Sequence, residues 1–326
     1  MKKFCILISP FLIGIFALFF GSYHIGPLEI LKILINFAPK TKSLSVQKAI
    51  IWEIRLPRVL LAGLTGAALS GSGAVLQAIF KNPLVDSYIL GISAGAAFGC
   101  AITIAFFSFL PIQPMAFVFG ILAVALTYFT AKSQSEVSRL ALVLAGVIVT
   151  AFFSAMVSII KFLVDPHRLQ SIVYWLMGSF SLADWKTIKV TAPGIIIGLI
   201  PLILMSWRLN ILSMGEEEAK LLGIDVEKER ILFIAFSTIA VASATSACGI
   251  IGWIGLMVPH LIRMTFGPDH KALLPLSITG GASLMIIADT ISRTLTSFDI
   301  PVGIITAIAG APFFIYLMRK SGTGWN

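Results

Sequence analysis

The sequence predicts an all-α polytopic membrane protein with about ten transmembrane helices. Hydrophobic residues make up 58% of the 326 residues and only 12% are charged, whereas a soluble domain carries about 25% charged residues. The mean hydropathy is +0.98. At about 20 residues per transmembrane helix, this apolar content suffices for roughly nine or ten spans and leaves little chain over. The composition therefore excludes a fused ATPase or binding domain, and we expect residues 1–326 to form a single transmembrane domain.

Uncharged apolar segments, separated by short polar loops, mark the expected spans. They are residues 4–21, 59–79, 88–107, 115–131, 140–160, 190–207, 231–249, 250–262, 272–288 and 300–318. The first lacks a small-x-small cleavage pattern, so we interpret it as a retained span rather than a signal peptide. The eighth is the weakest, because 231–262 is one uncharged stretch, too long for one span and short for two. We expect the chain to break there near residues 247–250.

The charged residues lie mainly in the loops and sum to +9. An even number of spans places both termini on one side, and Lys2, Lys3, Arg319 and Lys320 all favour the cytoplasm. The first expected outer loop is strongly basic. Its cations are Lys32, Lys40, Lys42, Lys48, Arg55 and Arg58, opposed by Glu29 and Glu53. Such a loop is either a solvated face or a docking surface for an acidic partner, since complementary charge steers association.

The longest expected inner loop, about 208–230, contains a short amphipathic helix. The acids Glu216–Glu218 suit the positive end of a helix dipole, and Gly223 is a suitable C-terminal cap. Ala219 and Leu222 are expected to form one small apolar face. This helix either lies on the lipid headgroups or fits a groove on a cytoplasmic subunit.

Two further patterns concern packing between the spans. Gly91, Gly95 and Gly99 recur every four residues, which predicts a smooth stripe along a helix where a second backbone approaches closely. Asp289 and Arg293 are also four residues apart. We expect them to form an ion pair in which Asp289 orients Arg293 at the outer end of the ninth span.

Patterns that mark several classes of enzyme or binding protein are missing. No G-x-x-x-x-G-K-[ST] loop occurs, so the chain is not expected to hydrolyse ATP, and neither H-E-x-x-H nor G-x-S-x-G is present. The cysteines, Cys5, Cys100 and Cys248, have no metal-binding spacing. No basic run interleaved with aromatic residues suggests nucleic-acid binding. We therefore expect no catalytic residue, no metal site and no nucleic-acid partner.

Several motifs at consistent spacing carry a resemblance to a known family. In the first half they are Arg55-Leu-Pro-Arg58, Gly66–Gly73 followed by Gln77, Asn82-Pro-Leu84 and Leu90–Ala96. In the second half they are Gly252–His260, Arg263, Asp289 with Arg293, Pro301–Gly303 and Gly310–Pro312. From about residue 50 to 320, the chain resembles the permease subunits of binding-protein-dependent ABC importers for iron-siderophores, haem and cobalamin.

The resemblance implies the type II ABC importer permease fold, in a multi-pass protein of a bacterial or archaeal cytoplasmic (inner) membrane. It further implies a homodimer surrounded by lipid, with two cytoplasmic ATPase subunits and one extracytoplasmic substrate-binding protein. The permease itself is not catalytic and holds no cofactor, because ATP and Mg²⁺ bind to the ATPase subunits. Both termini are expected in the cytoplasm.

The family's functional residues carry over to matching positions of this chain. Arg55, Arg58 and Arg293 are expected to bind glutamates of the binding protein, because a planar guanidinium binds a carboxylate with two hydrogen bonds. The residues that match the family's cytoplasmic gates are Asn82 with Leu84 and Val137 with Ser138. The residues that match its ATPase-coupling pattern are Gly215, Glu216, Ala219, Leu222 and Gly223.

The motifs narrow the substrate only to a few classes. The general signature favours a metal chelate of the ferric siderophore, haem or cobalamin type. Residues 171–180 and 206–210 are instead similar to the branch that imports molybdate or tungstate, so an oxyanion importer is the alternative. An ion-coupled secondary transporter is a remote alternative, because it would need intramembrane acids or sodium sites and only Asp289 is available.

Overall fold

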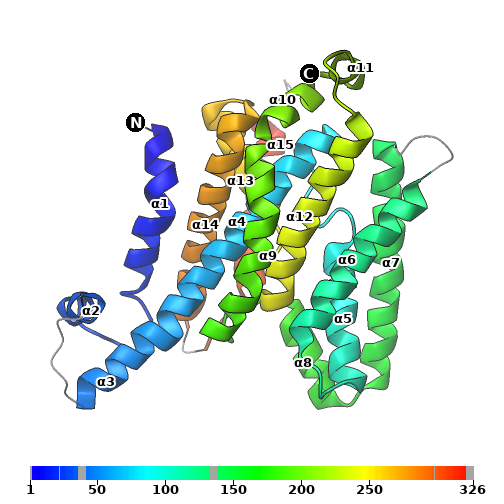
Figure 1. Ribbon diagram of the computed structural model, residues 1–326. Helices are drawn as coiled ribbons and strands as arrows, with labels where there is room; N and C mark the ends of the chain where they lie inside the picture. Colours follow the sequence, from blue (N-terminus) through cyan, green and yellow to red (C-terminus); the bar gives the residue numbers. More distant parts are fainter. Residues whose placement is uncertain (1, 22, 36–41, 133–137, 297, 321–326) are drawn as a thin grey trace.

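The computed structural model describes residues 2–21, 23–35, 42–132, 138–296 and 298–320, and within them all regular structure is helical (Figure 1). Each apolar segment predicted from the sequence corresponds to one helix. These helices are α1 (Lys2–Ala17), α4 (Leu56–Phe80), α5 (Ile92–Phe106), α6 (Ile112–Ala131), α7 (Arg139–Leu163), α9 (Trp185–Leu204), α12 (Val226–Cys248), α13 (Ile254–Phe266), α14 (His270–Thr294) and α15 (Val302–Lys320). The predicted all-α membrane fold is therefore confirmed.

These helices differ in their capacity to cross a membrane. Among the described residues, six helical stretches are long and apolar enough, and the one that contains α4 already begins at Val46. α5 and α13 have only 15 and 13 residues, fewer than the roughly 20 that a full crossing needs. The predicted weakness of the eighth span is thus confirmed. At α5 the predicted start at residue 88 is wrong, because residues 81–91 form a loop and the helix begins only at Ile92. The Tyr88 hydroxyl in this loop lies 3.1 Å from Thr245 Oγ1 of α12.

α12 and α13 separate where the sequence predicts a break. α12 ends at Cys248, and Gly249 has a φ of 76°, in the left-handed region that glycine adopts without steric penalty. α13 begins only at Ile254, later than the predicted start at residue 250. An irregular connection therefore lies between two apolar helices, which is tolerated in a membrane protein where the freed backbone groups are buried in protein.

The remaining helices are short and lie at the two ends of the molecule. They are α2 (Pro27–Leu34), α3 (Lys42–Ala49), the π-helical turn η1 (Ile50–Arg55), α8 (Pro166–Leu176), α10 (Ser206–Met214) and α11 (Glu216–Leu221). Figure 1 shows α2, α3 and α8 at one end, which we call the α8 end, and α10 and α11 at the other, the α11 end. α1 begins and α15 ends at the α11 end. The ends of the described chain thus lie on one side, as an even number of spans predicts.

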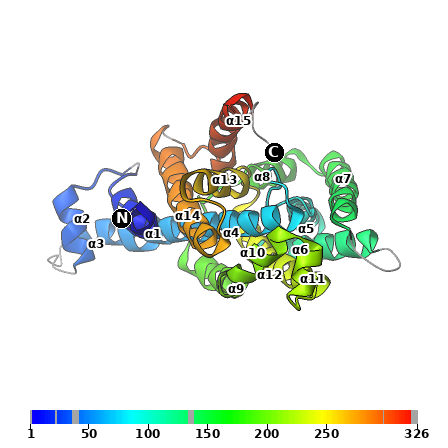
Figure 2. The same cartoon turned by 90° about the horizontal axis from the view of Figure 1, so that it is seen from above.

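α4 forms the centre of the bundle. It packs against α9, α12, α13 and α14, and Figure 2 shows these helices around it, with α7 and α1 at opposite edges. The contact with α14 is very close, because a Cβ atom at Gly66 would lie 2.2 Å from the carbonyl oxygen of Gly281. Small residues therefore let the two central backbones touch directly.

The predicted stripe of small residues is a packing surface. A Cβ atom at Gly95 would lie 2.3 Å from the carbonyl oxygen of Phe119, and one at Gly99 would lie 2.5 Å from that of Met115. Both carbonyls belong to α6, so the stripe seats α5 on the backbone of α6. The prediction of close packing is confirmed.

Replacing Gly95 with alanine is expected to destabilise the protein, because the added methyl group meets a backbone oxygen that cannot rotate away. Overpacking of this kind costs about 1–3 kcal/mol. The measurement is the midpoint of thermal unfolding in detergent. Gly252→Ala is the matched control, since a Cβ atom there meets nothing within 4 Å. Equal midpoints for the two variants would contradict the close approach.

Candidate functional site

A cluster of charged side chains lies at the α8 end, between α4 and α14. Arg58 of α4 donates from Nε to Asp289 Oδ1 of α14 at 2.8 Å and from Nη1 to Asp299 Oδ2 at 2.6 Å. Arg58 and Asp289 are both buried. Burial of a charge is tolerated in such a place only with a partner. Together with Arg55 and Arg293, these residues are called the arginine cluster below.

The other two arginines of the cluster bind the end of α1. Arg293 donates to the carbonyl oxygens of Ala17 and Phe20, at 2.6 and 3.0 Å. Arg55 donates to the carbonyl oxygens of Leu18, at 2.7 Å, and Tyr23. Ala17 is the last residue of α1 and the other three residues follow it, so the guanidinium groups donate to backbone acceptors at and beyond the end of the helix.

This geometry revises the expected pairing of Asp289. Arg293 Nε lies 3.6 Å from Asp289 Oδ2, so the predicted contact exists, but Arg58 is the closer partner. Sequence spacing could not reveal that partner, which is 231 positions away. Arg55, Arg58 and Arg293 each bind groups within the chain, and each residue is at most 7% exposed. Their binding to glutamates of another protein stays a prediction.

Three of the gate residues predicted from the sequence, Asn82, Leu84 and Ser138, lie at the α11 end, where Asn82 and Ser138 shape the backbone. Asn82 Oδ1 accepts a hydrogen bond from the backbone N–H of Leu84 at 2.9 Å, which forms a tight turn. Ser138 Oγ caps α7 by accepting from Ala141 N at 3.0 Å. Val137 lies outside the described residues. The gating role itself stays a prediction.

Gln77 of α4 holds the loop that contains Asn82 and Leu84. Its Nε2 lies 3.3 Å from the carbonyl oxygens of Val85 and Gly255, and its Oε1 accepts from Arg263 Nη2 at 3.0 Å. One buried amide therefore joins α4, the 81–91 loop and α13. The sequence analysis placed Gln77 in a family motif but assigned it no role, because its partners come from a distant part of the chain.

The predicted coupling helix is present as α11, and its surroundings correct one detail. Gly215 precedes it, and Gly223 follows with a φ of 77°, which makes it a suitable C-terminal cap. Ala219 is fully buried, whereas Leu222 is 60% exposed. The prediction that Ala219 and Leu222 share one apolar face is wrong, because Ala219 seats the helix on the chain and Leu222 faces away from it.

Two ion pairs of Glu216 also hold α11 in place. Glu216 Oε1 accepts hydrogen bonds from Arg139 Nη2 of α7 and from Arg230 Nη2 of α12, each at 2.7 Å. A cavity of about 580 Å³ lies beside them. It is lined by Ser138, Arg139, Glu216, Lys220, Asp225, Val226, Glu227 and Arg230.

The segment 206–210, which is similar to the molybdate branch, makes contacts within the chain. Arg208 of α10 pairs with Glu229 of α12. Asn210 donates to Asp269 Oδ1 at 2.7 Å and accepts from the backbone N–H of His270 at 2.8 Å. The hydrogen bond from Asn210 and the backbone N–H of Lys271 hold the pKa of Asp269 below its usual value. These side chains join α10 to α12 and α14.

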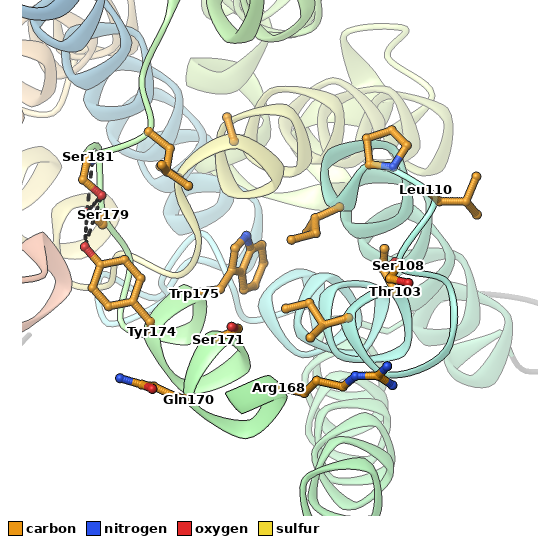
Figure 3. A pocket seen from close by; sticks show the side chains of 16 residues that line it. Thr103, Ser108, Leu110, Arg168, Gln170, Ser171, Tyr174, Trp175, Ser179 and Ser181 are labelled. Carbon is orange, nitrogen blue, oxygen red and sulfur yellow. Dashed lines mark hydrogen bonds between the residues drawn. The ribbon is translucent and has the colours of Figure 1, made fainter. Parts of the chain in front are cut away.

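A cavity with a volume of about 780 Å³ lies at the α8 end (Figure 3). Its walls come from α5, the start of α6, α8, the loop after α8 and the end of α12. The lining residues are Thr103, Ile104, Ser108, Leu110, Pro111, Ile112, Arg168, Gln170, Ser171, Tyr174, Trp175, Ser179, Ser181, Leu182, Ala247 and Cys248. The sequence analysis did not locate this cavity, because its walls come from segments far apart in the chain.

Hydroxyl groups dominate the polar lining of this cavity. Figure 3 shows Tyr174, Ser179 and Ser181 pointing toward one another on one side. Tyr174 Oη lies 3.1 Å from Ser181 Oγ, which also accepts from Ser179 Oγ at 3.0 Å. Arg168, across the cavity, pairs with Asp165 at 3.2 Å and donates to the carbonyl oxygen of Ala105. The lining therefore presents mainly neutral donors and acceptors.

The described part of the chain holds no group of three or more His, Cys, Asp or Glu side chains that could bind a metal ion. The cavity walls, with their hydroxyl and amide groups, are likewise poor ligands for a bare transition-metal ion, which prefers imidazole or thiolate. A ligand of this cavity would be held by hydrogen bonds and apolar contact.

Asp289→Asn is expected to destabilise the protein strongly, because it removes the buried one of the two carboxylates, Asp289 and Asp299, that pair with the buried guanidinium of Arg58. Breaking a buried pair costs about 3–5 kcal/mol. The measurement is the thermal midpoint of the purified protein. Asp165→Asn is the control, since asparagine also caps a helix and the Asp165–Arg168 pair is half exposed. A midpoint of Asp289→Asn equal to that of the control would show that the arginine cluster does not stabilise the fold.

Comparison with known proteins identifies the family. The model of the FecCD transport family matches residues 8–320. A probable iron chelatin transport system permease protein of Helicobacter pylori is 41% identical, with 98% of this chain and 99% of that protein covered. The molybdate import system permease protein of Haemophilus influenzae is 39% identical, with 95% and 93% covered.

Two further matches extend the comparison. The cobalamin import system permease protein of Halobacterium salinarum is 40% identical, with 83% of this chain and 74% of that protein covered. A solved structure of a metal-chelate type ABC transporter in an inward-facing conformation superposes with a TM-score of 0.87 at 37% identity, covering 98% of this chain and 99% of the other. With a family model that spans nearly its whole length, this chain belongs to the FecCD transport family, as the non-catalytic membrane permease of an ABC importer.

Proposed function

We propose that this permease carries an intact metal chelate of the ferric siderophore, haem or cobalamin type across the cytoplasmic membrane. The observation that carries the proposal is the cavity at the α8 end. Its volume of about 780 Å³ falls in the range of pockets that hold drug-sized organic ligands, about 300–1,000 Å³. Its hydroxyl and amide groups suit the oxygen-rich periphery of a chelate.

The alternative is a molybdate or tungstate importer. It is favoured by the 39% identity to the Haemophilus influenzae molybdate permease over nearly the whole chain. A tetrahedral oxyanion would fill only a small part of the cavity. The guanidinium of Arg168, which lines the cavity, already binds Asp165 and a backbone carbonyl. The chelate is therefore our first choice.

We further propose that the protein works as a homodimer, with the α8 end outside and the α11 end in the cytoplasm. A binding protein would dock at the α8 end and two ATPase subunits at the α11 end. The exposed side chains of Lys32 and Lys48 add positive charge to the α8 end, which suits an acidic partner. Arg55, Arg58 and Arg293 lie at the same end. For them to bind the partner's glutamates, the carbonyls at and after the end of α1 that occupy Arg55 and Arg293, and the carboxylates that occupy Arg58, would have to move aside.

ATP-driven uptake in proteoliposomes tests the proposed function. The permease is reconstituted with its ATPase subunits and binding protein, and uptake of a ferric chelate labelled with radioactive iron is compared with uptake of labelled molybdate. We expect ATP-dependent accumulation of the chelate. Accumulation of molybdate alone would establish the alternative, and uptake driven by an ion gradient without ATPase subunits would overturn the importer proposal.

We propose that α11 is the part of each permease that enters the ATPase subunit. Leu221 and Leu222 are 88% and 60% exposed at its end, and such apolar side chains on a short helix suit insertion into a groove. Gly215 and Gly223 delimit the helix, and buried Ala219 seats it. The gates at Asn82 with Leu84 and at Val137 with Ser138 would lie on the same side of the membrane.

Leu222→Glu is expected to weaken ATPase binding, because it places a charge where an apolar side chain enters the partner. Loss of a buried anchor of this kind typically costs 2 kcal/mol or more, roughly a 30-fold loss of affinity. Co-purification of the ATPase subunits measures it. Leu28→Glu is the control, since Leu28 is exposed on α2 at the opposite end. An unchanged yield of ATPase with Leu222→Glu would contradict the assignment.

A further inference from the structure

Glu216 joins three helices through one carboxylate oxygen. Glu216 is the first residue of α11. Its Oε1 accepts one hydrogen bond from Nη2 of Arg139, the first residue of α7, and another from Nη2 of Arg230, near the start of α12. Both distances are 2.7 Å. Hydrogen bonds between ionised groups are short and directional. This set of three residues is called the Glu216 link.

Apart from the Glu216 link, α7 and α11 have little direct contact that would make them move together. α7 packs mainly against α5 and α6, whereas α11 packs against α10 and α12. Between α7 and α11 lies the polar cavity of about 580 Å³, so charged side chains, not close apolar packing, face each other across this gap. Without the Glu216 link, α11 has room to shift while the start of α7 stays in place.

The link reaches the start of α7 directly. Arg139 follows Ser138, whose hydroxyl caps the helix by accepting from Ala141 N. A displacement of Glu216 therefore acts on the first turn of α7, beside a predicted gate residue. Arg230 is almost fully buried, with its side chain 8% exposed, whereas Arg139 and Glu216 are 27% and 40% exposed. Arg230 thus forms the buried side of the link in α12, and Arg139 forms its more exposed side.

We propose that Glu216 is a positioning residue that transmits displacements of α11 to the beginning of α7 through Arg139. This inference rests on the proposed function, in which α11 receives the movement of the ATPase subunit. Glu216 acts through its charge and position and does not itself contact ATP or substrate. Its loss uncouples ATP hydrolysis from transport and leaves the binding of the ATPase subunit intact, because the exposed apolar end of α11 is unaltered.

Glu216→Gln in the complete reconstituted transporter tests the proposal. The side chain keeps its shape and loses the charge that holds two arginines. The readout is the coupling ratio, the amount of labelled chelate taken up for each ATP hydrolysed. We expect hydrolysis close to that of the wild type and a coupling ratio lower by about five-fold or more, the scale of a typical coupling free energy. A purely structural role would lower both activities together.

Glu217→Gln is the matched control. Glu217 is the next residue of the same helix, is exposed, and makes no ion pair with the residues that the structure describes. We expect its coupling ratio to equal that of the wild type. A ratio lowered equally in both variants would overturn the proposal, because the general negative charge of α11 would then be responsible.

Arg139→Gln keeps the proposal testable if Glu216→Gln fails to assemble, because it removes the connection to α7 and leaves the Arg230 pair in place. Residues that act through one contact have non-additive effects, so the double variant should match the stronger single one. The proposal would be overturned if the double variant lowered the coupling ratio by the product of the two single effects. A wild-type coupling ratio in either single variant would also overturn it. Absence of ATP-driven uptake by the wild type would instead overturn the proposed function.

Discussion

The ion pair between Arg58 of α4 and Asp289 of α14 joins the two helices at the centre of the molecule. Between apolar helices an unpaired charge is very unfavourable, so the Arg58–Asp289 pair determines which groups the neighbouring charged residues bind. Asp299 satisfies a second donor of Arg58, and Arg293 turns to the carbonyls at the end of α1. α1 lies at an edge of the bundle (Figure 2), yet it is bound at the α8 end by backbone groups that no helix can satisfy itself.

The α11 end is stabilised differently. Its charge pairs include Arg139 with Glu216, which is partly exposed and borders a polar cavity, and Arg208 with Glu229, in which the arginine is partly exposed. Pairs of this kind contribute about 0–1 kcal/mol each, far less than a buried pair loses when it is broken. Segments with few buried apolar contacts open at low free energy. The α11 end is therefore suited to move when a partner acts on it, while the arginine cluster keeps the opposite end of α1, α4 and α14 together.

The chain is similar to importers of different substrates because some of the similar residues make contacts that hold the helices together. Arg208 and Asn210, within the segment that is similar to the molybdate branch, bind Glu229 and Asp269 and so connect α10 to its neighbours. Similar residues at such positions indicate a common fold and do not indicate which substrate is transported. The cavity beside α8 is more informative, because its volume of about 780 Å³ suits an organic ligand of drug size. This size is the physical basis for preferring a chelate to a small oxyanion.

The sequence by itself determined which apolar segments are helices, because hydropathy and length decide what enters a membrane, and it located the break near Gly249 and the short helix at Glu216–Leu221. It also indicated the Gly95 stripe and the family. Only the tertiary structure decided the partners: Arg58 for Asp289, Gln77 for the 81–91 loop, and two arginines for Glu216. Spacing along a helix reveals only neighbours three or four residues away. Contacts between distant helices depend on how close their backbones come, and that distance exists only in the folded bundle.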